Sequence, residues 1–175
     1  MDISAIKKAF PIFTHHPDLV YLDSAATALK PASVIAALTD YYEESSANIA
    51  RGIYPMAERT TIAFEHSRQL VATFLHAERP EEIIFTAGTT ASLNLAAALI
   101  AHRLTAGDNI VITAAEHHSN LLPFKELAHQ HQVELRILPV NKDGSLDLTA
   151  LTQLVDTRTV LVAFSAVSNV LGIIN

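Results

Sequence analysis

The sequence contains no cysteine among its 175 residues. This absence excludes disulfides, a thiolate zinc site and a cysteine nucleophile within the chain. Basic residues are also few, because 12 Lys and Arg stand against 18 Asp and Glu and give a formal net charge of −6. Nucleic-acid binding depends on clustered positive charge, and the basic residues here are scattered. We therefore expect no nucleic-acid partner.

The sequence shows neither an export signal nor a clear membrane span. Residues 1–13 lack a basic start followed by an apolar stretch and a small-residue cleavage site, so we expect a cytoplasmic protein. The longest uncharged run, residues 83–101, is long enough for a span, but a glycine and several polar residues interrupt its first half. A strand, a turn and a helix of a soluble protein explain this run better than a membrane segment.

From residue 81 onward, short apolar runs alternate with helical patterns. This alternation predicts an α/β fold with a mainly parallel sheet and flanking helices. The apolar runs predict strands, in chain order, within residues 82–88, 109–115, 133–140 and 159–167. The helical patterns between them predict helices within residues 89–104, 120–132 and 147–156.

The first part of the chain has a helical pattern. Pro31 is expected in the first turn of a helix over residues 31–44, and an apolar stripe predicts a long helix over residues 56–75. Residues 1–20 are interpreted as an N-terminal arm, followed by one domain over residues 21–175. Because an apolar segment without a covering helix follows the last predicted strand, we expect this domain to be the front part of a longer fold.

Residues 86–92 form a candidate phosphate site. A predicted buried strand ends at Thr86, Gly88 permits a tight turn, and Thr89 and Thr90 fall at the start of a helix. The unpaired N–H groups and the dipole of a helix N-terminus favour an anion, and two hydroxyls add donors. The alternative is structural, with Thr89 acting only as the helix cap and Thr90 as an ordinary residue of the first turn.

Glu116, His117 and His118 form a second polar cluster, at the carboxyl end of the next predicted strand. Adjacent residues at a strand end point to opposite faces, and no HExxH spacing is present, so no metal site is expected. Ligands of open parallel sheets bind at the carboxyl edge, where Gly88–Thr90 and Ser168–Asn169 are also expected. Three polar clusters on one crevice predict a phosphate-bearing ligand.

Six short segments together resemble a known family. They are "YLDSAATALKP" (21–31), "ARG" (50–52), "GTT" (88–90), "AGDNI" (106–110), "EHHSNLLPF" (116–124) and "SNVLG" (168–172). In this order they are similar to the N-terminal part of the cysteine desulfurases of the class V aminotransferase superfamily, most of all the SufS and CsdA group. The resemblance implies the large domain of a fold-type-I transferase that depends on pyridoxal 5'-phosphate (PLP).

The resemblance also implies an activity and the roles of individual residues. The family removes sulfur from L-cysteine, giving L-alanine and an enzyme-bound persulfide, and works as a homodimer that passes sulfur to an acceptor protein, as in iron–sulfur cluster assembly. His117 matches the catalytic residue that stacks on the cofactor ring and takes part in proton transfer, with Glu116 and His118 as supporting residues. The cofactor-binding positions are Gly88, Thr89, Thr90, His117 and Asn169, the last near the phenolic oxygen.

The chain departs from the family pattern in two ways. Alanine stands at four positions that are usually polar in this group, namely Ala50, Ala87, Ala91 and Ala166. The family's Schiff-base lysine, the aspartate that pairs with the pyridine nitrogen and the sulfur-accepting cysteine would all lie beyond residue 175. Lys30, Lys125 and Lys142 match no Schiff-base motif and are interpreted as solvated. Residues 1–175 alone are therefore expected to be inactive.

Two alternatives remain open from the sequence. One is another class V enzyme, such as a selenocysteine lyase, a kynureninase-like hydrolase or a transaminase. The other is a non-catalytic protein that keeps half of the fold and acts by association.

Overall fold

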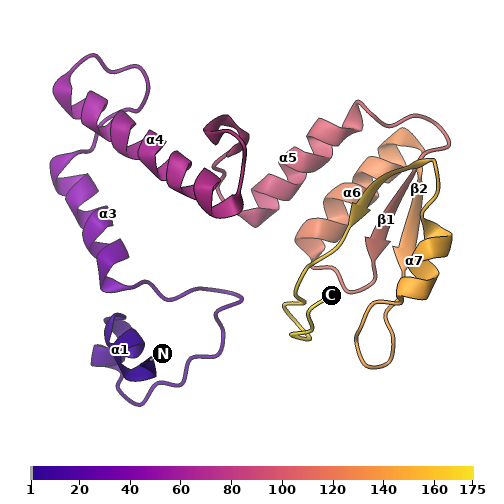
Figure 1. Cartoon of the computed structure of the whole chain (residues 1–175), viewed down its shortest axis with the longest axis horizontal. Coiled ribbons are helices and arrows are strands. Elements are labelled where there is room, and N and C mark those ends of the chain that lie inside the picture. Colours follow the sequence, from indigo (N-terminus) through magenta and orange to yellow (C-terminus); the bar gives the residue numbers. More distant parts are fainter. Residues whose placement is uncertain (1) are drawn as a thin grey trace. The chain divides into compact units, whose positions relative to one another are not determined.

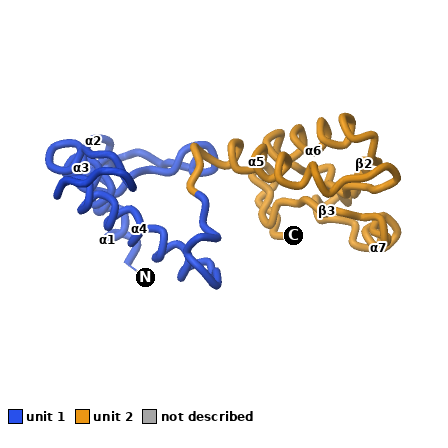
Figure 2. The backbone as a smooth tube through the Cα atoms, turned by 90° about the horizontal axis from the view of Figure 1, so that it is seen from above, with its two compact units in different colours: residues 1–84 blue, residues 85–175 orange. Residues whose placement is uncertain are grey.

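The computed structural model describes residues 2–175, which divide into two compact units, residues 2–84 and 85–175 (Figure 2). The first unit is helical, and the second holds the parallel sheet. The predicted boundary between an arm at residues 1–20 and a domain at 21–175 stays a prediction. No helix within residues 2–175 combines the length and the apolar character needed to cross a membrane.

The described part of the first unit contains four α-helices and a short 3-10 helix: α1 (Ile3–Lys8), α2 (Ile12–His15), α3 (Ala32–Glu44), α4 (Pro55–Leu75) and η1 (Pro80–Glu82). The two predicted helices are present, although Pro31 precedes α3 as its N-cap instead of lying in its first turn. On α4 the buried residues are the small Ala57, Thr60 and Ala72, whereas the predicted apolar stripe is largely exposed, with Phe74 at 82%.

The predicted strand at residues 82–88 is wrong. Residues 80–82 form η1, and Ile83 has extended dihedral angles (φ −90°, ψ 117°) without belonging to a strand. Its carbonyl accepts a hydrogen bond from the Arg68 guanidinium of α4. A strand needs a neighbouring backbone for its ladder, and here a side chain occupies the carbonyl that a ladder would use.

The second unit is an α/β layer built on three parallel strands. Its elements are α5 (Thr89–Ala101), β1 (Asn109–Thr113), α6 (His118–His131), β2 (Glu134–Leu138), α7 (Leu148–Leu154) and β3 (Thr159–Ala163), with the strand order β2-β1-β3 (Figure 1). The other three predicted strands and the three predicted helices are thus confirmed, with shorter bounds except for α6, which begins at His118, two residues before its predicted start. Every residue of β1 is buried, as expected for the central strand of a covered parallel sheet.

The core of this unit lies between the sheet and helices α5 and α6. Ile110 and Ile112 of β1 are fully buried and belong to one apolar cluster with Phe124 and Leu127 of α6 and Ala97 of α5. Alternating residues of a strand face the same side, so Ile110 and Ile112 share the face that α6 covers. This packing holds α5 and α6 against β1, and the polar clusters lie near the first turns of these two helices.

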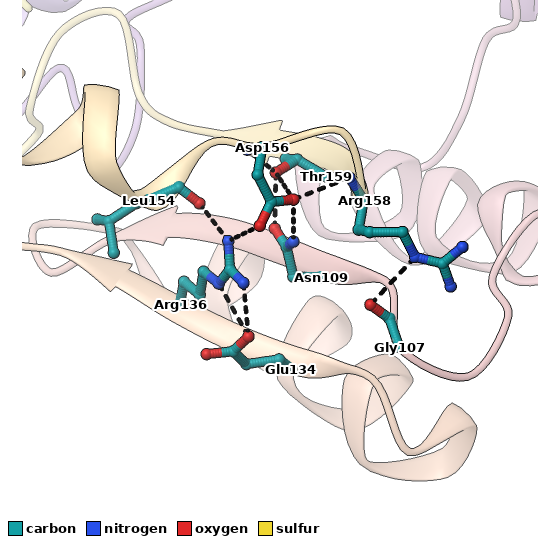
Figure 3. Close-up of polar contacts among 8 residues, drawn as sticks. All are labelled: Gly107, Asn109, Glu134, Arg136, Leu154, Asp156, Arg158 and Thr159. Carbon is teal, nitrogen blue, oxygen red and sulfur yellow. Dashed lines mark hydrogen bonds and ion pairs between the residues drawn. The ribbon is translucent and has the colours of Figure 1, made fainter.

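A network of charged and polar side chains lies at the amino ends of the strands, opposite the carboxyl ends where a ligand is expected (Figure 3). Asp156 accepts hydrogen bonds from Arg136 Nη1 (2.7 Å), the Arg158 backbone N–H (2.8 Å) and Asn109 Nδ2 (3.0 Å). These donors lower the pKa of Asp156 from 3.8 to about 2, and the hydrogen bond from Arg136 has the largest effect. The network joins the starts of β1, β2 and β3.

We expect Asp156→Asn to change how stability depends on pH. A carboxylate with a lowered pKa contributes its full stabilisation above the unfolded-state value of 3.8 and loses it as pH falls to about 2. The free energy of unfolding, measured in urea between pH 7 and pH 2, should therefore fall less steeply below about pH 4 in the variant than in the wild type. Asp18→Asn, an exposed residue of the first unit, is the control and should leave the slope unchanged.

Candidate functional site

The start of α5 is shaped by Gly88. Gly88 is the N-cap residue with φ 137°, in the region of positive φ that favours glycine, and no side chain caps the helix. Thr89 is the first helical residue, so the alternative in which Thr89 serves as the cap is wrong. The N–H groups of the first turn have no acceptor within the helix, which leaves donors for an anion.

Hydroxyl groups around this turn divide into two sets. The hydroxyls of Thr86 and Ser92 lie 2.6 Å apart, and the Thr86 hydroxyl also lies 3.1 Å from the Gly88 carbonyl, so both are used to hold the turn. The hydroxyls of Thr89 and Thr90 make no hydrogen bond within residues 2–175. Both remain available to a ligand at the helix N-terminus.

Glu116 fixes the connection from β1 to α6. Its carboxylate accepts hydrogen bonds from the hydroxyl of Thr113 at the end of β1 (2.5 Å), from Asn120 Nδ2 in α6 (2.7 Å), and from the backbone N–H (2.9 Å) and hydroxyl (2.8 Å) of Ser165 after β3. Burial would raise the pKa of Glu116, but the donors Asn120, Thr113 and Ser165 together outweigh burial and lower it. The ionised carboxylate therefore ties together three segments at the carboxyl edge of the sheet.

His117 is the N-cap of α6, not a strand residue. Its Nδ1 accepts a hydrogen bond from the backbone N–H of Ser119 (3.1 Å) and lies 2.8 Å from the Ser119 hydroxyl. The ring is exposed, and the ring of His118 is tilted against it with centroids 6.3 Å apart. The imidazole is thus held at a helix start with one nitrogen engaged by the cap.

A cavity of about 500 Å³ lies against the first turns of α5 and α6. Two of the predicted site residues, Thr90 and His117, line it, whereas Gly88, Thr89 and Asn169 do not. The remaining lining is contributed by Asn94, His118, Ser119, Leu122, Pro123 and Glu126. The structure therefore brings Thr90, in the first turn of α5, and the His117 imidazole to one cavity.

Asn169, the last of the predicted site residues, lies in a turn after β3. Gly172 N–H donates to the Ser168 carbonyl (2.9 Å), and Val167 pairs with Ile174 in an isolated antiparallel bridge, so this segment folds back on itself. Asn169 is exposed at that turn. Of the three predicted polar clusters, the first contributes Thr90 to the cavity and the second contributes His117 and His118, whereas the third contributes no residue. Ser165, which precedes the third cluster, donates its backbone N–H to Glu116 of the second.

Sequence reasoning missed three polar residues at this site, namely Asn94, Ser119 and Ser165. Asn94 follows Thr90 by one helical turn, and its Nδ2 donates to the Thr90 carbonyl (2.8 Å), so the spacing alone could have placed it on the same face. Ser119 lies two residues after the capping histidine, a spacing typical of N-cap bonds. Ser165 meets Glu116 across 49 residues, and no local pattern predicts that contact.

The family model for "Aminotransferase class-V" matches residues 20–175. A probable cysteine desulfurase of Halalkalibacterium halodurans is 43% identical and is aligned with 100% of this chain and 44% of the relative. A cysteine desulfurase of Pectobacterium atrosepticum is 42% identical, with 99% of this chain and 44% of the relative covered. The chain thus spans less than half the length of these curated relatives.

Solved structures give the same picture. The apo structure of a cysteine desulfurase from Thermococcus onnurineus is similar with a TM-score of 0.91 and 37% identity, covering 98% of this chain and 42% of the other. The cysteine desulfurase CsdA (S-sulfonic acid) from Escherichia coli gives 0.86 and 36%, covering 99% and 43%. These similarities confirm the predicted α/β fold of the fold-type-I class and its partial extent.

Proposed function

We propose that this chain, which belongs to the aminotransferase class-V family, forms the cofactor-binding part of a PLP-dependent cysteine desulfurase. The reaction breaks the C–S bond of L-cysteine, passes the sulfur to an enzyme thiol as a persulfide and leaves L-alanine. The observation that carries the proposal is the cavity lined by both Thr90 and His117, since Thr90 lies at a helix start whose N–H groups lack helical partners and His117 supplies an imidazole. The relatives named as cysteine desulfurases support the choice of reaction.

The residues present fit PLP. The phosphate would accept hydrogen bonds from the N–H groups of the first turn of α5 and from the hydroxyls of Thr89 and Thr90, beside the positive φ of Gly88. When bound, PLP supplies an electron sink for charge that develops on an amino-acid substrate. The His117 imidazole would pack against the cofactor ring and move protons at the substrate. Asn169 would lie near the phenolic oxygen of PLP and donate a hydrogen bond there.

Two groups that the reaction requires are not among residues 1–175. The chain has no cysteine to accept sulfur, and no lysine lines the cavity within the part of the chain that the structure describes. We propose that the lysine that binds the cofactor covalently and the acceptor cysteine belong to the part of the relatives' length that this chain does not span. We further propose a cytoplasmic homodimer that serves a sulfur-acceptor protein in iron–sulfur cluster assembly.

The test is alanine formation. Protein purified at the length that its source produces should have an intact mass well above 19.0 kDa, and with PLP, L-cysteine and a reducing thiol it should release alanine and sulfide. The 175-residue chain should release none. Alanine from selenocysteine or kynurenine but not from cysteine would instead assign one of the other class-V activities, and a natural mass of 19.0 kDa without any turnover would assign a non-catalytic role.

We expect Thr90→Val to weaken PLP binding. Valine has the shape of threonine without its hydroxyl, so the variant removes one hydrogen bond to a charged phosphate, worth about 1.5–3 kcal/mol, or roughly 10- to 150-fold in Kd. Equilibrium dialysis with PLP measures the change. Thr105→Val is a control in the same unit, because the Thr105 hydroxyl bonds Asp108 (2.8 Å) away from the cavity, and its Kd should equal that of the wild type.

A further inference from the structure

The bond between Ser119 and His117 restricts where the imidazole carries its proton. Ser119 has two potential donors near His117 Nδ1, its backbone N–H at 3.1 Å and its hydroxyl at 2.8 Å. A backbone N–H can only donate, so Nδ1 must present a lone pair to it. A neutral imidazole has one protonated nitrogen, and that nitrogen must then be Nε2.

Other contacts hold this arrangement in place. Ser119 is the second residue of α6, and its N–H is one of the helix donors that lack a partner within the helix, so the bond to Nδ1 is also the N-cap bond. On the preceding side, Glu116 accepts four hydrogen bonds and fixes the chain where it enters the helix. A flipped ring would lose the cap and leave the Ser119 N–H unpaired.

We infer that Ser119 is a positioning residue that holds His117 in the Nε2–H tautomer and leaves Nε2 as the ring nitrogen that exchanges protons with a ligand. The tautomer follows from the contacts of the protein alone. The proton exchange rests on the proposed function, because it requires a substrate beside His117. Ser119 acts through His117 and needs no contact with the reacting atoms.

Nitrogen NMR of the histidine rings tests the tautomer without cofactor or turnover. The protein is labelled with ¹⁵N in its imidazoles, and the signals of His117 are assigned from their loss in His117→Gln. In mildly alkaline solution we expect Nδ1 to have the chemical shift of an unprotonated nitrogen and Nε2 that of a protonated one. A protonated Nδ1 would overturn the inference, even in a protein that desulfurates cysteine.

Two variants separate the backbone N–H of Ser119 from its hydroxyl. The hydroxyl can donate to Nδ1 or accept from it and so favours neither tautomer, whereas the backbone N–H can only donate. Ser119→Ala and Ser119→Thr both keep the backbone donor, and both should keep the Nε2–H spectrum of the wild type. An Nδ1–H signal in Ser119→Ala would show that the hydroxyl selects the tautomer and would overturn its assignment to the backbone bond. A wild-type protein that shows the Nε2–H spectrum but forms no alanine from L-cysteine would count against the proposed function. The inferred tautomer would still hold.

Discussion

His117→Asn should lower kcat for alanine formation by about 10²- to 10⁴-fold, the range over which a positioned acid or base accelerates proton transfer. Asparagine is a favoured N-cap residue, so its side-chain oxygen can still accept the Ser119 N–H bond that His117 Nδ1 now accepts (3.1 Å). The variant therefore removes the imidazole while the helix start keeps its cap. The measurement is the rate of alanine release from L-cysteine at saturating PLP.

The controls for this variant separate chemistry from folding. His129→Ala removes another histidine of α6 that does not line the cavity shared by Thr90 and His117, and its kcat should equal that of the wild type. The thermal unfolding midpoint of His117→Asn should stay within a few degrees of the wild type, because the cap is retained. A His117→Asn protein that is folded, binds PLP and keeps at least a tenth of the wild-type kcat would show that His117 is not the residue that moves the proton.

The sequence predicts those parts of the fold whose structure depends on the residues of the segment itself. The run at residues 109–113 is apolar throughout, and β1 proved to be the buried central strand. Residues 83–85 have a similar apolar pattern but form no strand, since periodicity carries no information on whether a neighbouring backbone is available. The Arg68 bond to the Ile83 carbonyl joins residues 15 apart and is set by tertiary structure.

The site divides in the same way. Gly88 and Thr90 could be predicted, because a glycine between a strand-like run and a helix is a local signal for positive φ and for a helix start. His117 was predicted beside the sheet edge, but its role as the cap of α6 was missed, since histidine is not a favoured cap residue and its choice depends on the geometry of Ser119. The sharing of one cavity by Thr90 and His117 depends on how α5 packs on α6, which only the structure shows.

Glu116→Ala should destabilise the second unit by about 3 kcal/mol, the largest loss of stability we expect from a single polar side chain here. The carboxylate accepts four hydrogen bonds, and its removal leaves the amide of the buried Asn120 and the N–H of Ser165 without their partner. Hydrogen bonds to a charged group contribute about 1.5–3 kcal/mol each, but part of this is recovered because Glu116 and Ser165 are only half-buried and water can replace the carboxylate. Urea unfolding followed by circular dichroism measures the change.

Glu116→Gln is the matched variant, and it distinguishes the role of charge from that of shape. The glutamine oxygen can still accept from Thr113 and Ser165, but its NH₂ group would face the Asn120 Nδ2 donor, so about half of the loss should remain. Because donors lower the pKa of Glu116, its contribution is present above the ordinary value of 4.5 and is lost as pH falls below it, a dependence that the glutamine variant should lack. If Glu116→Gln and the wild type unfold with equal free energies at pH 7, shape alone holds the three segments, and the ionised carboxylate has no part in placing His117.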